Sequence, residues 1–432
     1  MIDNIYIQPD PKDFPALCLR PKQNEADMNT LLTDIFAKVE KEGDKALFEF
    51  TSRFDRVDVP RLKISASEIQ KAKEVLPDDL MLAIQDARQN IIRFHELQKA
   101  NEIKVETTNG VICSQKSVGI QKIGIYIPGG TAPLFSTVLM LAIPAVLAGC
   151  REIVLCSPPN SEGNIDPAIL YTADLCGVDK IYALGGAQAI AAMTVGTETI
   201  DAVYKIFGPG NQYVTAAKQF AARYGVAMDS PAGPSELLVF ADRTSNPEFV
   251  AADLLSQAEH GVDSQVMLVS KHLEVVQNVI QVLNTQLKEL PRKEMAEGAI
   301  QNSKAIVFAD VDHAIDFINE YGPEHLILAV DDYQTLLGKI VNAGSVFLGH
   351  YCPESAGDYA SGTNHTLPTD GWVKSCSGTN IDSFTKKITY QEISKEGIQN
   401  LGNTIMKMAE HEGLVAHKKA VEIRLNQLKF KN

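Results

Sequence analysis

Short apolar strands alternate with helical stretches from residue 122 to residue 349, and this rhythm constrains the fold more than any other feature. The first unit reads KIGIYIP, then the small-residue turn GGTAP, then the helical LFSTVLMLAIPAVLAG. EIVLC, KIYALGG and AVYKIFGPG follow, and LLVFAD, QVMLVS, AIVFAD, HLILAV and SVFLG repeat the pattern. Strands that alternate with helices build βαβ units and parallel sheets. Because 432 residues also exceed one ordinary core, we expect two α/β domains.

The segments outside this rhythm indicate the domain boundaries. The opening residues carry four prolines and little periodicity, which is typical of an arm. A helical pattern then runs to about Ala100, and Asn109-Gly110 between two β-rich runs predicts a two-residue hairpin. We therefore expect an N-terminal arm (1–23), a discontinuous first α/β domain (24–121 and 237–380), a second α/β domain (122–236) and a helical C-terminal tail (381–432).

Composition and charge exclude several classes of partner. The chain is 45% hydrophobic and 22% charged, as in soluble globular proteins. A net charge of −14 without a basic run argues against nucleic acid and anionic membranes. The uncharged stretch Ile123–Cys150 is long enough to span a bilayer, but prolines and glycines interrupt it, so we expect a strand, a turn and a core helix. Seven scattered cysteines and an opening without a secretory signal suit the cytoplasm.

Glycine turns follow three successive strands of the expected second domain, at Gly129-Gly130, Gly185-Gly186 and Gly208-Pro209-Gly210. Open α/β sheets bind ligands beyond the carboxyl ends of their strands, and backbone amides there can receive phosphates. None of the turns is G-x-G-x-x-G, however, and no acidic residue stands about 20 positions after the first one to bind a ribose. From spacing alone, tight turns explain the glycines as well as a dinucleotide does.

The segment AADLLSQAEHG, Ala251–Gly261, predicts a helix with two polar side chains at its end. Ser245 to Glu248 has the spacing of a capping box, and Gly261 is placed to end the helix. Gln257 and His260 are three residues apart in the last turn, so their side chains are neighbours. Together they could hold two corners of a divalent metal site. Taken alone, the pair is explained better by a core histidine hydrogen-bonded to a glutamine.

Glu324 and His325 place a carboxylate beside an imidazole just ahead of an apolar strand. Such a pair can supply one base that activates water and another that accepts an alcohol proton. Two adjacent residues alone fit a surface turn better. The pair also stands at the amino end of its strand, whereas parallel-sheet active sites usually lie at the carboxyl ends.

The stretch from Pro353 to Thr369 has many turn formers and few large apolar residues, so we expect a functional loop. It offers Glu354, Asp358 and His365, and the tail offers Glu412 and His417. Taken together, the donors form a set with oxygen and nitrogen but no sulfur, which suits zinc or manganese: Gln257, His260, Asp358 and His417.

Seven motifs in this order resemble histidinol dehydrogenase: IYIPGGTAPLFSTVLMLAIPA, ALGGAQAIAA, KIFGPGNQYV, PAGPSE, DLLSQAEHG, YGPEHLIL and ESAGDYASGTNHTLPT. The similarity runs from about residue 25 to the C-terminus. It implies two incomplete, atypical Rossmann-like domains and a cytoplasmic homodimer, in which the tail crosses to the partner and the active sites are shared. It also implies the last step of histidine biosynthesis, in which zinc, one ion per subunit, and two NAD⁺ support the oxidation of L-histidinol through bound L-histidinaldehyde to L-histidine.

The resemblance also assigns residues by position. The implied zinc ligands, which also contact the substrate, are Gln257, His260, Asp358 and His417. The implied catalytic residues are Glu324 and His325, and His325 also contacts the substrate. Ser235, His365 and Glu412 fall where the substrate is held, and Tyr126, Gln188 and Asn211 where NAD is held. Two other functions compete with this one, namely a zinc hydrolase with Glu324 as general base and a non-catalytic ligand-binding protein with a structural metal.

Overall fold

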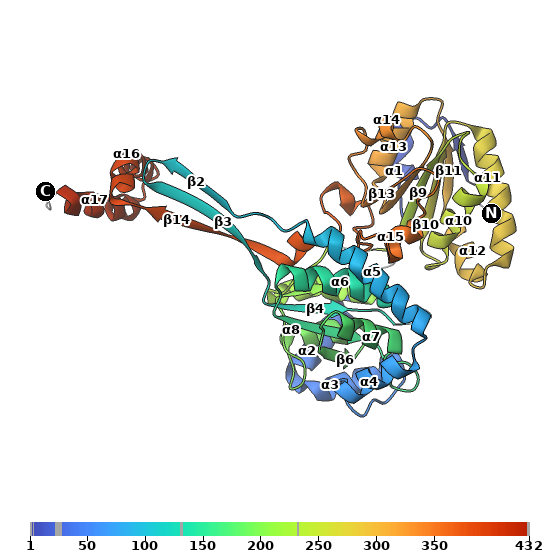
Figure 1. Ribbon diagram of the computed structural model, residues 1–432, viewed down its shortest axis with the longest axis horizontal. Helices are drawn as coiled ribbons and strands as arrows, with labels where there is room; N and C mark the ends of the chain where they lie inside the picture. The colour runs from blue at the N-terminus through green and yellow to red at the C-terminus, as the bar shows by residue number, and fades with distance from the viewer. Residues whose placement is uncertain (1, 3, 22–27, 130–132, 231–232, 430–432) are drawn as a thin grey trace. The chain divides into compact units, whose positions relative to one another are not determined.

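The computed structural model describes residue 2 and residues 4–21, 28–129, 133–230 and 233–429 (Figure 1). The chain divides into two compact units. The larger contains residues 1–98 and 120–383, and the smaller contains residues 99–119 and 384–432. Two parallel sheets lie in the larger unit, and one antiparallel sheet lies in the smaller.

The first parallel sheet has five strands in the order β6-β5-β4-β7-β8. Its members are β4 (Lys122–Tyr126), β5 (Glu152–Ser157), β6 (Lys180–Ala183), β7 (Lys205–Phe207) and β8 (Ala227–Met228). Every pairing is parallel. The chain winds outward from β4 to β6 and then returns to the other side at β7, as in one half of a Rossmann fold.

The second parallel sheet has six strands in the order β1-β11-β10-β9-β12-β13. They are β1 (Ile5–Ile7), β9 (Glu236–Ala241), β10 (Gln265–Ser270), β11 (Lys304–Val307), β12 (His325–Ala329) and β13 (Ser345–Leu348). From β9 to β13 this sheet repeats the winding of the first, so the prediction of two Rossmann-like sheets is confirmed. The N-terminal arm contributes β1, which pairs with β11 at the sheet edge.

Helices cover both faces of the six-stranded sheet (Figure 1). On one face lie α10 (Pro247–Ala258), α11 (Leu273–Gln286) and α12 (Lys293–Gln301), and on the other α1 (Phe14–Leu17), α13 (Val311–Tyr321) and α14 (Gln334–Leu337). Strands buried on two faces need apolar residues at successive positions, which explains the uninterrupted apolar runs in the sequence.

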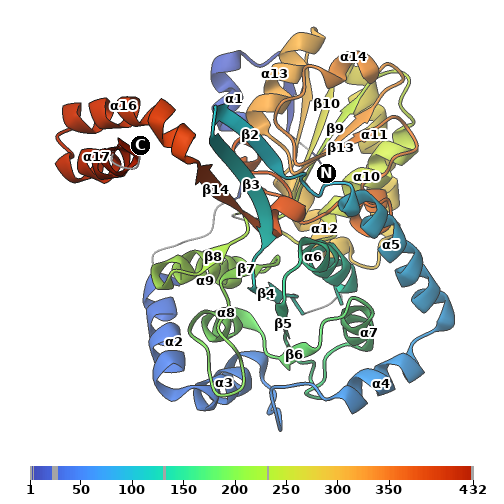
Figure 2. The same cartoon turned by 60° about the vertical axis from the view of Figure 1, so that its left-hand side comes forward.

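The five-stranded sheet carries its own helices, α6 (Phe135–Ala148), α7 (Pro167–Leu175), α8 (Gly186–Val195) and α9 (Gln212–Ala221). Four helices from earlier in the chain pack against them: α2 (Met28–Glu42), α3 (Asp44–Phe50), α4 (Ala66–Val75) and α5 (Asp78–Glu96) (Figure 2). In particular, α2 contacts α8 and α9, α4 contacts α7, and α5 contacts α6.

This packing differs from the expected grouping of residues 24–121 with 237–380. The buried ring of Phe36 lies 4.8 Å from the ring of Phe220 in the second domain. Helical periodicity shows which face of a helix is buried but not which sheet covers it. The described part of this segment, residues 28–98, therefore belongs with the sheet that follows it in the chain.

The smaller unit contains a three-stranded sheet and two helices. Its strands are β2 (Ile103–Thr108), β3 (Val111–Gly119) and β14 (Thr385–Ile393), and its helices are α16 (Lys395–His411) and α17 (Val415–Lys429). Asn109-Gly110 forms the predicted hairpin turn, and Gly413, with φ +74°, separates the helices. The tail is not helical throughout, because β14 pairs with β3 over nine residues.

The long uncharged stretch forms β4 and α6, as expected, while the turn expected between them includes residues 130–132, which lie outside the described residues. Within the described ranges, no helix is both long enough and apolar enough to cross a membrane. The interior proline of α6, Pro144, is buried along with most of that helix.

A buried ion pair holds the turn after β7. The side chains of Lys218 on α9 and Asp229 after β8 are 1% and 6% exposed, and Nζ lies 2.5 Å from Oδ1. Lys218 Nζ donates to the Gly208 carbonyl at 2.7 Å, and the Gly208 N–H donates to Asp229 Oδ2 at 2.7 Å. Gly208 has φ +124°, and a Cβ there would collide with the backbone of Tyr126.

We predict that Lys218→Met destabilises the protein by about 3–5 kcal/mol, because it leaves the Asp229 carboxylate buried without a partner. Chemical denaturation followed by circular dichroism measures the loss. Arg243→Met is the matched control, since the Arg243–Glu274 pair is exposed and contributes about 0–1 kcal/mol. A loss no larger than that of the control would contradict this account of the turn.

Candidate active site

The end of α10 lies at the same sheet edge as Glu324 and His325. His325 begins β12, Glu324 immediately precedes it, and His325 is in register with Leu237 of β9 and Ser345 of β13. The crossover helix α10 starts after the carboxyl end of β9 and returns to the amino end of β10. Gln257, in its last turn, therefore reaches the amino edge. This topology answers the objection that the pair stands at the unusual end of its strand.

The start of α10 differs from the predicted capping box. Asn246 caps the helix, because its side chain accepts the Glu248 N–H at 2.9 Å. Ser245 instead donates its hydroxyl to the Ala329 carbonyl at 2.5 Å. The helix ends at Ala258, so Gly261 does not terminate it.

The backbone of Glu236, the first residue of β9, contacts both Glu324 and His325. Its N–H donates to Glu324 Oε2 at 2.9 Å, and its carbonyl lies 3.2 Å from His325 Nδ1. Because a carbonyl only accepts, this contact assigns the imidazole proton to Nδ1. Nε2 is then the basic nitrogen, and it faces Asp358 Oδ1 at 3.7 Å.

Burial sets the basicity of the pair. Glu324 is 6% exposed and His325 is 4% exposed. Burial lowers the pKa of His325 to about 4, although the nearby Asp358 carboxylate acts in the opposite direction. Burial also raises the pKa of Glu324 well above its ordinary value. His325 is therefore neutral near pH 7, and the deprotonated Glu324 is a stronger base than an ordinary carboxylate.

A third carboxylate joins them from α15 (Glu354–Tyr359), a short helix within the predicted loop. Glu354 is 1% exposed, and its Oε1 lies 3.5 Å from His325 Nδ1. Ligand atoms of His325, Glu354 and Asp358 all lie within 4.8 Å of one another. The sequence of the loop predicts no specific role for Glu354. Its spacing of four residues from Asp358 could have placed both carboxylates on one helix face.

The side chain of Gln257 supports a metal site. It is fully buried, and among the described residues neither its Oε1 nor its Nε2 has a hydrogen-bond partner. An unsatisfied buried amide costs about 1–3 kcal/mol. The alternative of a core histidine bonded to this glutamine is wrong, because His260 is exposed and does not meet the amide.

Among the other expected ligands of the larger unit, Asp358 belongs to the metal-ligand group with His325 and Glu354, and His260 is not in that group. Helix α10 also packs against α15, which carries Asp358. If His260 joins them, Gln257 and Asp358 would complete with it a set of oxygen and nitrogen donors of the kind that zinc takes.

The residues expected to hold the substrate fall in both units. Ser235 immediately precedes Glu236 at the same sheet edge. His365 contacts the Asp358 carbonyl through Nδ1 at 2.7 Å and Thr137 Oγ1 through Nε2 at 3.1 Å. Glu412 and His417 belong to the smaller unit, where Glu412 ends α16 and His417 lies on α17, and both are exposed.

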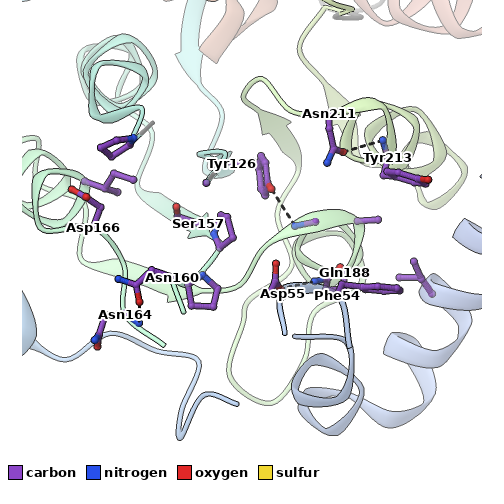
Figure 3. Close-up of a pocket in the computed structure, with 18 of the residues that line it drawn as sticks. Phe54, Asp55, Tyr126, Ser157, Asn160, Asn164, Asp166, Gln188, Asn211 and Tyr213 are labelled. Atoms are coloured by element: carbon purple, nitrogen blue, oxygen red, sulfur yellow. Dashed lines mark hydrogen bonds between the residues drawn. The ribbon is translucent and has the colours of Figure 1, made fainter. Parts of the chain in front are cut away.

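A separate cavity of about 660 Å³ opens at the carboxyl ends of the five-stranded sheet, and Tyr126, Gln188 and Asn211 all line it (Figure 3). Tyr126 OH accepts the Gly186 N–H at 3.1 Å. Asn211 caps α9 by accepting the N–H of Tyr213 at 3.0 Å. The cavity lies where the winding reverses between β4 and β7, which is where open α/β sheets bind nucleotides.

Asp55 is a lining residue that the sequence did not reveal. Gln188 Nε2 donates to Asp55 Oδ2 at 3.3 Å, and burial raises the pKa of Asp55 to about 6 (Figure 3). Phe54 lines the same wall. Both come from the segment after α3, which no motif links to the glycine turns.

We predict that Gln257→Met raises the melting temperature of the metal-free protein and abolishes the further increase caused by Zn²⁺. Methionine removes the unsatisfied amide and its oxygen ligand while it keeps a similar volume. Differential scanning fluorimetry with chelator and with Zn²⁺ measures both effects. Gln265→Met is the control. Gln265 is buried but bonded to Asn302 and Tyr321, so its loss should lower the melting temperature. A metal-free Gln257→Met protein that melts as low as this control would refute the prediction.

Known proteins resemble the chain over nearly its whole length. Residues 18–425 match the histidinol dehydrogenase family. Histidinol dehydrogenases of Bacteroides thetaiotaomicron and Vibrio parahaemolyticus are 55% and 50% identical, over 98% and 96% of both chains respectively. The crystal structure of histidinol dehydrogenase from Elizabethkingia anophelis superposes with a TM-score of 0.97 at 54% identity, covering 99% of this chain and 98% of that one. The chain therefore belongs to the histidinol dehydrogenase family, whose members are NAD-dependent oxidoreductases.

Proposed function

We propose that the protein oxidises L-histidinol to L-histidine through bound L-histidinaldehyde, with two NAD⁺ and one zinc ion per subunit. This is a four-electron oxidation and the last step of histidine biosynthesis. The observation that carries the proposal is the buried Glu324-His325 pair at one sheet edge, held by a single backbone residue beside the unpartnered amide of Gln257. The separate cavity lined by Tyr126, Gln188 and Asn211 favours a dehydrogenase over a hydrolase, which needs no nucleotide.

Four residues would hold zinc, namely Gln257, His260, Asp358 and, from the tail, His417. Bound there, the metal would fix the imidazole and amino nitrogens of the substrate and hold the reacting carbon still. Ser235, His365 and Glu412 would complete the contacts with the substrate. NAD⁺, bound in the cavity at the other sheet, would accept the hydride in each oxidation.

His325 acts as the base in the first oxidation. Its Nε2 accepts the proton of the alcohol as hydride leaves the carbon, which yields the aldehyde. The low pKa of His325, about 4, keeps this nitrogen unprotonated and ready near pH 7. The aldehyde stays bound while NADH is exchanged for a second NAD⁺, so a reactive intermediate does not escape.

Glu324 acts in the second oxidation. Its carboxylate takes a proton from water as the water oxygen adds to the aldehyde carbon, giving the hydrate anion, in which the former carbonyl oxygen carries the negative charge. His325 then accepts the hydroxyl proton of the hydrate as the second hydride leaves, and the product is the carboxylate. The raised pKa of Glu324 matches this demand for a base stronger than an exposed carboxylate.

We predict that Glu324→Gln slows the oxidation of supplied L-histidinaldehyde by roughly 10²–10⁴, the usual contribution of a general base, and slows alcohol oxidation far less. Glutamine keeps the shape of the side chain but cannot take a proton from water. NADH absorbance with each substrate separates the half-reactions. Equal losses in both would assign Glu324 another role. A parent protein that reduces no NAD⁺ with L-histidinol would refute the proposed function itself.

We further propose that the protein is a homodimer whose tail supplies His417 and Glu412 to the partner's site. The smaller unit is poor in buried residues, and it exposes large apolar side chains that require a covering surface. Among them, Met408 is 62% exposed, Val415 is 70% exposed and Ile423 is 50% exposed. A symmetric pair in which the tails cross has two composite sites.

Mixing a Glu324→Gln chain with a His417→Ala chain, each of which should have lost the oxidation of L-histidinaldehyde, tests this crossing when that oxidation is followed. If the tails cross, one site of the heterodimer contains both substitutions and the other contains neither. Activity should therefore return after the subunits exchange. If each tail stays with its own chain, every site keeps one lesion. Native mass spectrometry verifies the heterodimer. Lack of recovery with the heterodimer present would exclude a crossed tail.

A further inference from the structure

We propose that Arg20, in the N-terminal arm, is a positioning residue for Glu324 and His325. Its guanidinium joins the two backbone segments that hold the catalytic pair, although it touches neither side chain. The inference rests on the proposed function of that pair. The arm lies outside the motifs that resemble the family, and its sequence offers no sign of such a role.

The first segment that Arg20 fixes is the start of β9. Nε of Arg20 lies 2.9 Å from Glu236 Oε1, and Nη2 lies 2.9 Å from Glu236 Oε2, so the pair is bidentate. The two side chains are 10% and 2% exposed. The Asp370 N–H also donates to Glu236 Oε1 at 2.7 Å. The residue whose backbone meets both Glu324 and His325 is thus held by its side chain as well.

The second segment is the end of α13, just before the pair. Nη2 of Arg20 donates to the Tyr321 carbonyl at 2.7 Å and to the Gly322 carbonyl at 3.3 Å. The guanidinium also lies over the Tyr321 ring, 4.0 Å from its centroid. One planar group therefore sets the distance between β9 and the turn that leads to Glu324.

The rest of the arm holds Arg20 in place. Nη1 donates to the Cys18 carbonyl at 3.2 Å, and Lys304 Nζ donates to the Leu17 carbonyl at 2.7 Å. A buried ion pair of this kind is weak evidence for stability, because well-packed apolar residues often serve as well. The fork of donors gives what apolar residues cannot, namely a fixed geometry between two backbone segments.

The test compares the full-length protein with Arg20→Ala and Arg20→Lys. Lys12→Met is the control, because it removes a charge from the same arm at an exposed pair with Asp10. A misplacement of about 1 Å can cost roughly 10²-fold in rate, so Arg20→Ala should lower kcat by about that factor. The dissociation constant for NAD⁺ should not change, because the cofactor cavity belongs to the other sheet.

Chemical rescue distinguishes positioning from a merely structural role. Guanidinium chloride, at a concentration that leaves the protein folded, should raise kcat of Arg20→Ala at least tenfold by refilling the site. Sodium chloride at equal ionic strength should not. Arg20→Lys keeps the charge but cannot bridge both oxygens of Glu236, so it should keep its melting temperature and still lose about tenfold in kcat. If Arg20→Ala fails to fold, Arg20→Lys decides the question.

Hydrogen exchange gives a readout that needs no activity. Peptides that contain residues 235–237 and 321–326 should exchange faster in both Arg20 variants than in the parent. Their exchange rates should be unchanged in Lys12→Met. Parental kcat and parental exchange in a folded Arg20→Lys protein would overturn the proposal. An inactive parent would instead refute the proposed function, while the exchange data would still report on the positioning.

Discussion

Two hydrogen bonds from one peptide residue define the geometry of the active site. The N–H and the carbonyl of Glu236 meet a carboxylate and an imidazole that follow each other on the neighbouring strand. Their spacing is a consequence of parallel pairing between β9 and β12, in which Leu237 is in register with His325. The catalytic pair is thus part of the hydrogen-bonding pattern of the sheet, continued by side chains where the strands begin.

The two sheets place their sites at opposite ends of the strands. They share one winding order, yet the cavity lined by Tyr126 and Gln188 lies beyond the carboxyl ends of one sheet, and the Glu324-His325 pair lies at the amino ends of the other. At carboxyl ends, the first turns of helices offer N–H groups that suit phosphates. At amino ends, the last turns of helices offer carbonyls and side chains such as Gln257, which suit a cation. The chemistry of each ligand matches the helix ends around it.

The sequence predicts the regular parts of this structure well, because apolar runs and turn residues act locally. The strands, the Asn109-Gly110 hairpin and the break at Gly413 all follow from such signals. Contacts between distant segments leave no local signal. Helices α2 to α5 show an amphipathic pattern but not their partner sheet, and Asp55 reaches the cofactor cavity from an unmarked segment. Glu354 and Arg20 act through partners far away in the chain, so only the folded structure brings them to the site.

The N-terminal arm also determines when the site can form during synthesis. Ile5 pairs with Ala305, and Arg20 meets Glu236 across 216 residues of chain. At roughly 5–20 residues per second, a ribosome needs on the order of tens of seconds to make that interval. The last strand of the five-stranded sheet ends at Met228, so this sheet can fold before the residues that pair with the arm have been synthesised. The segment made first can therefore take its place only after Glu236, Ala305 and Tyr321 have been made.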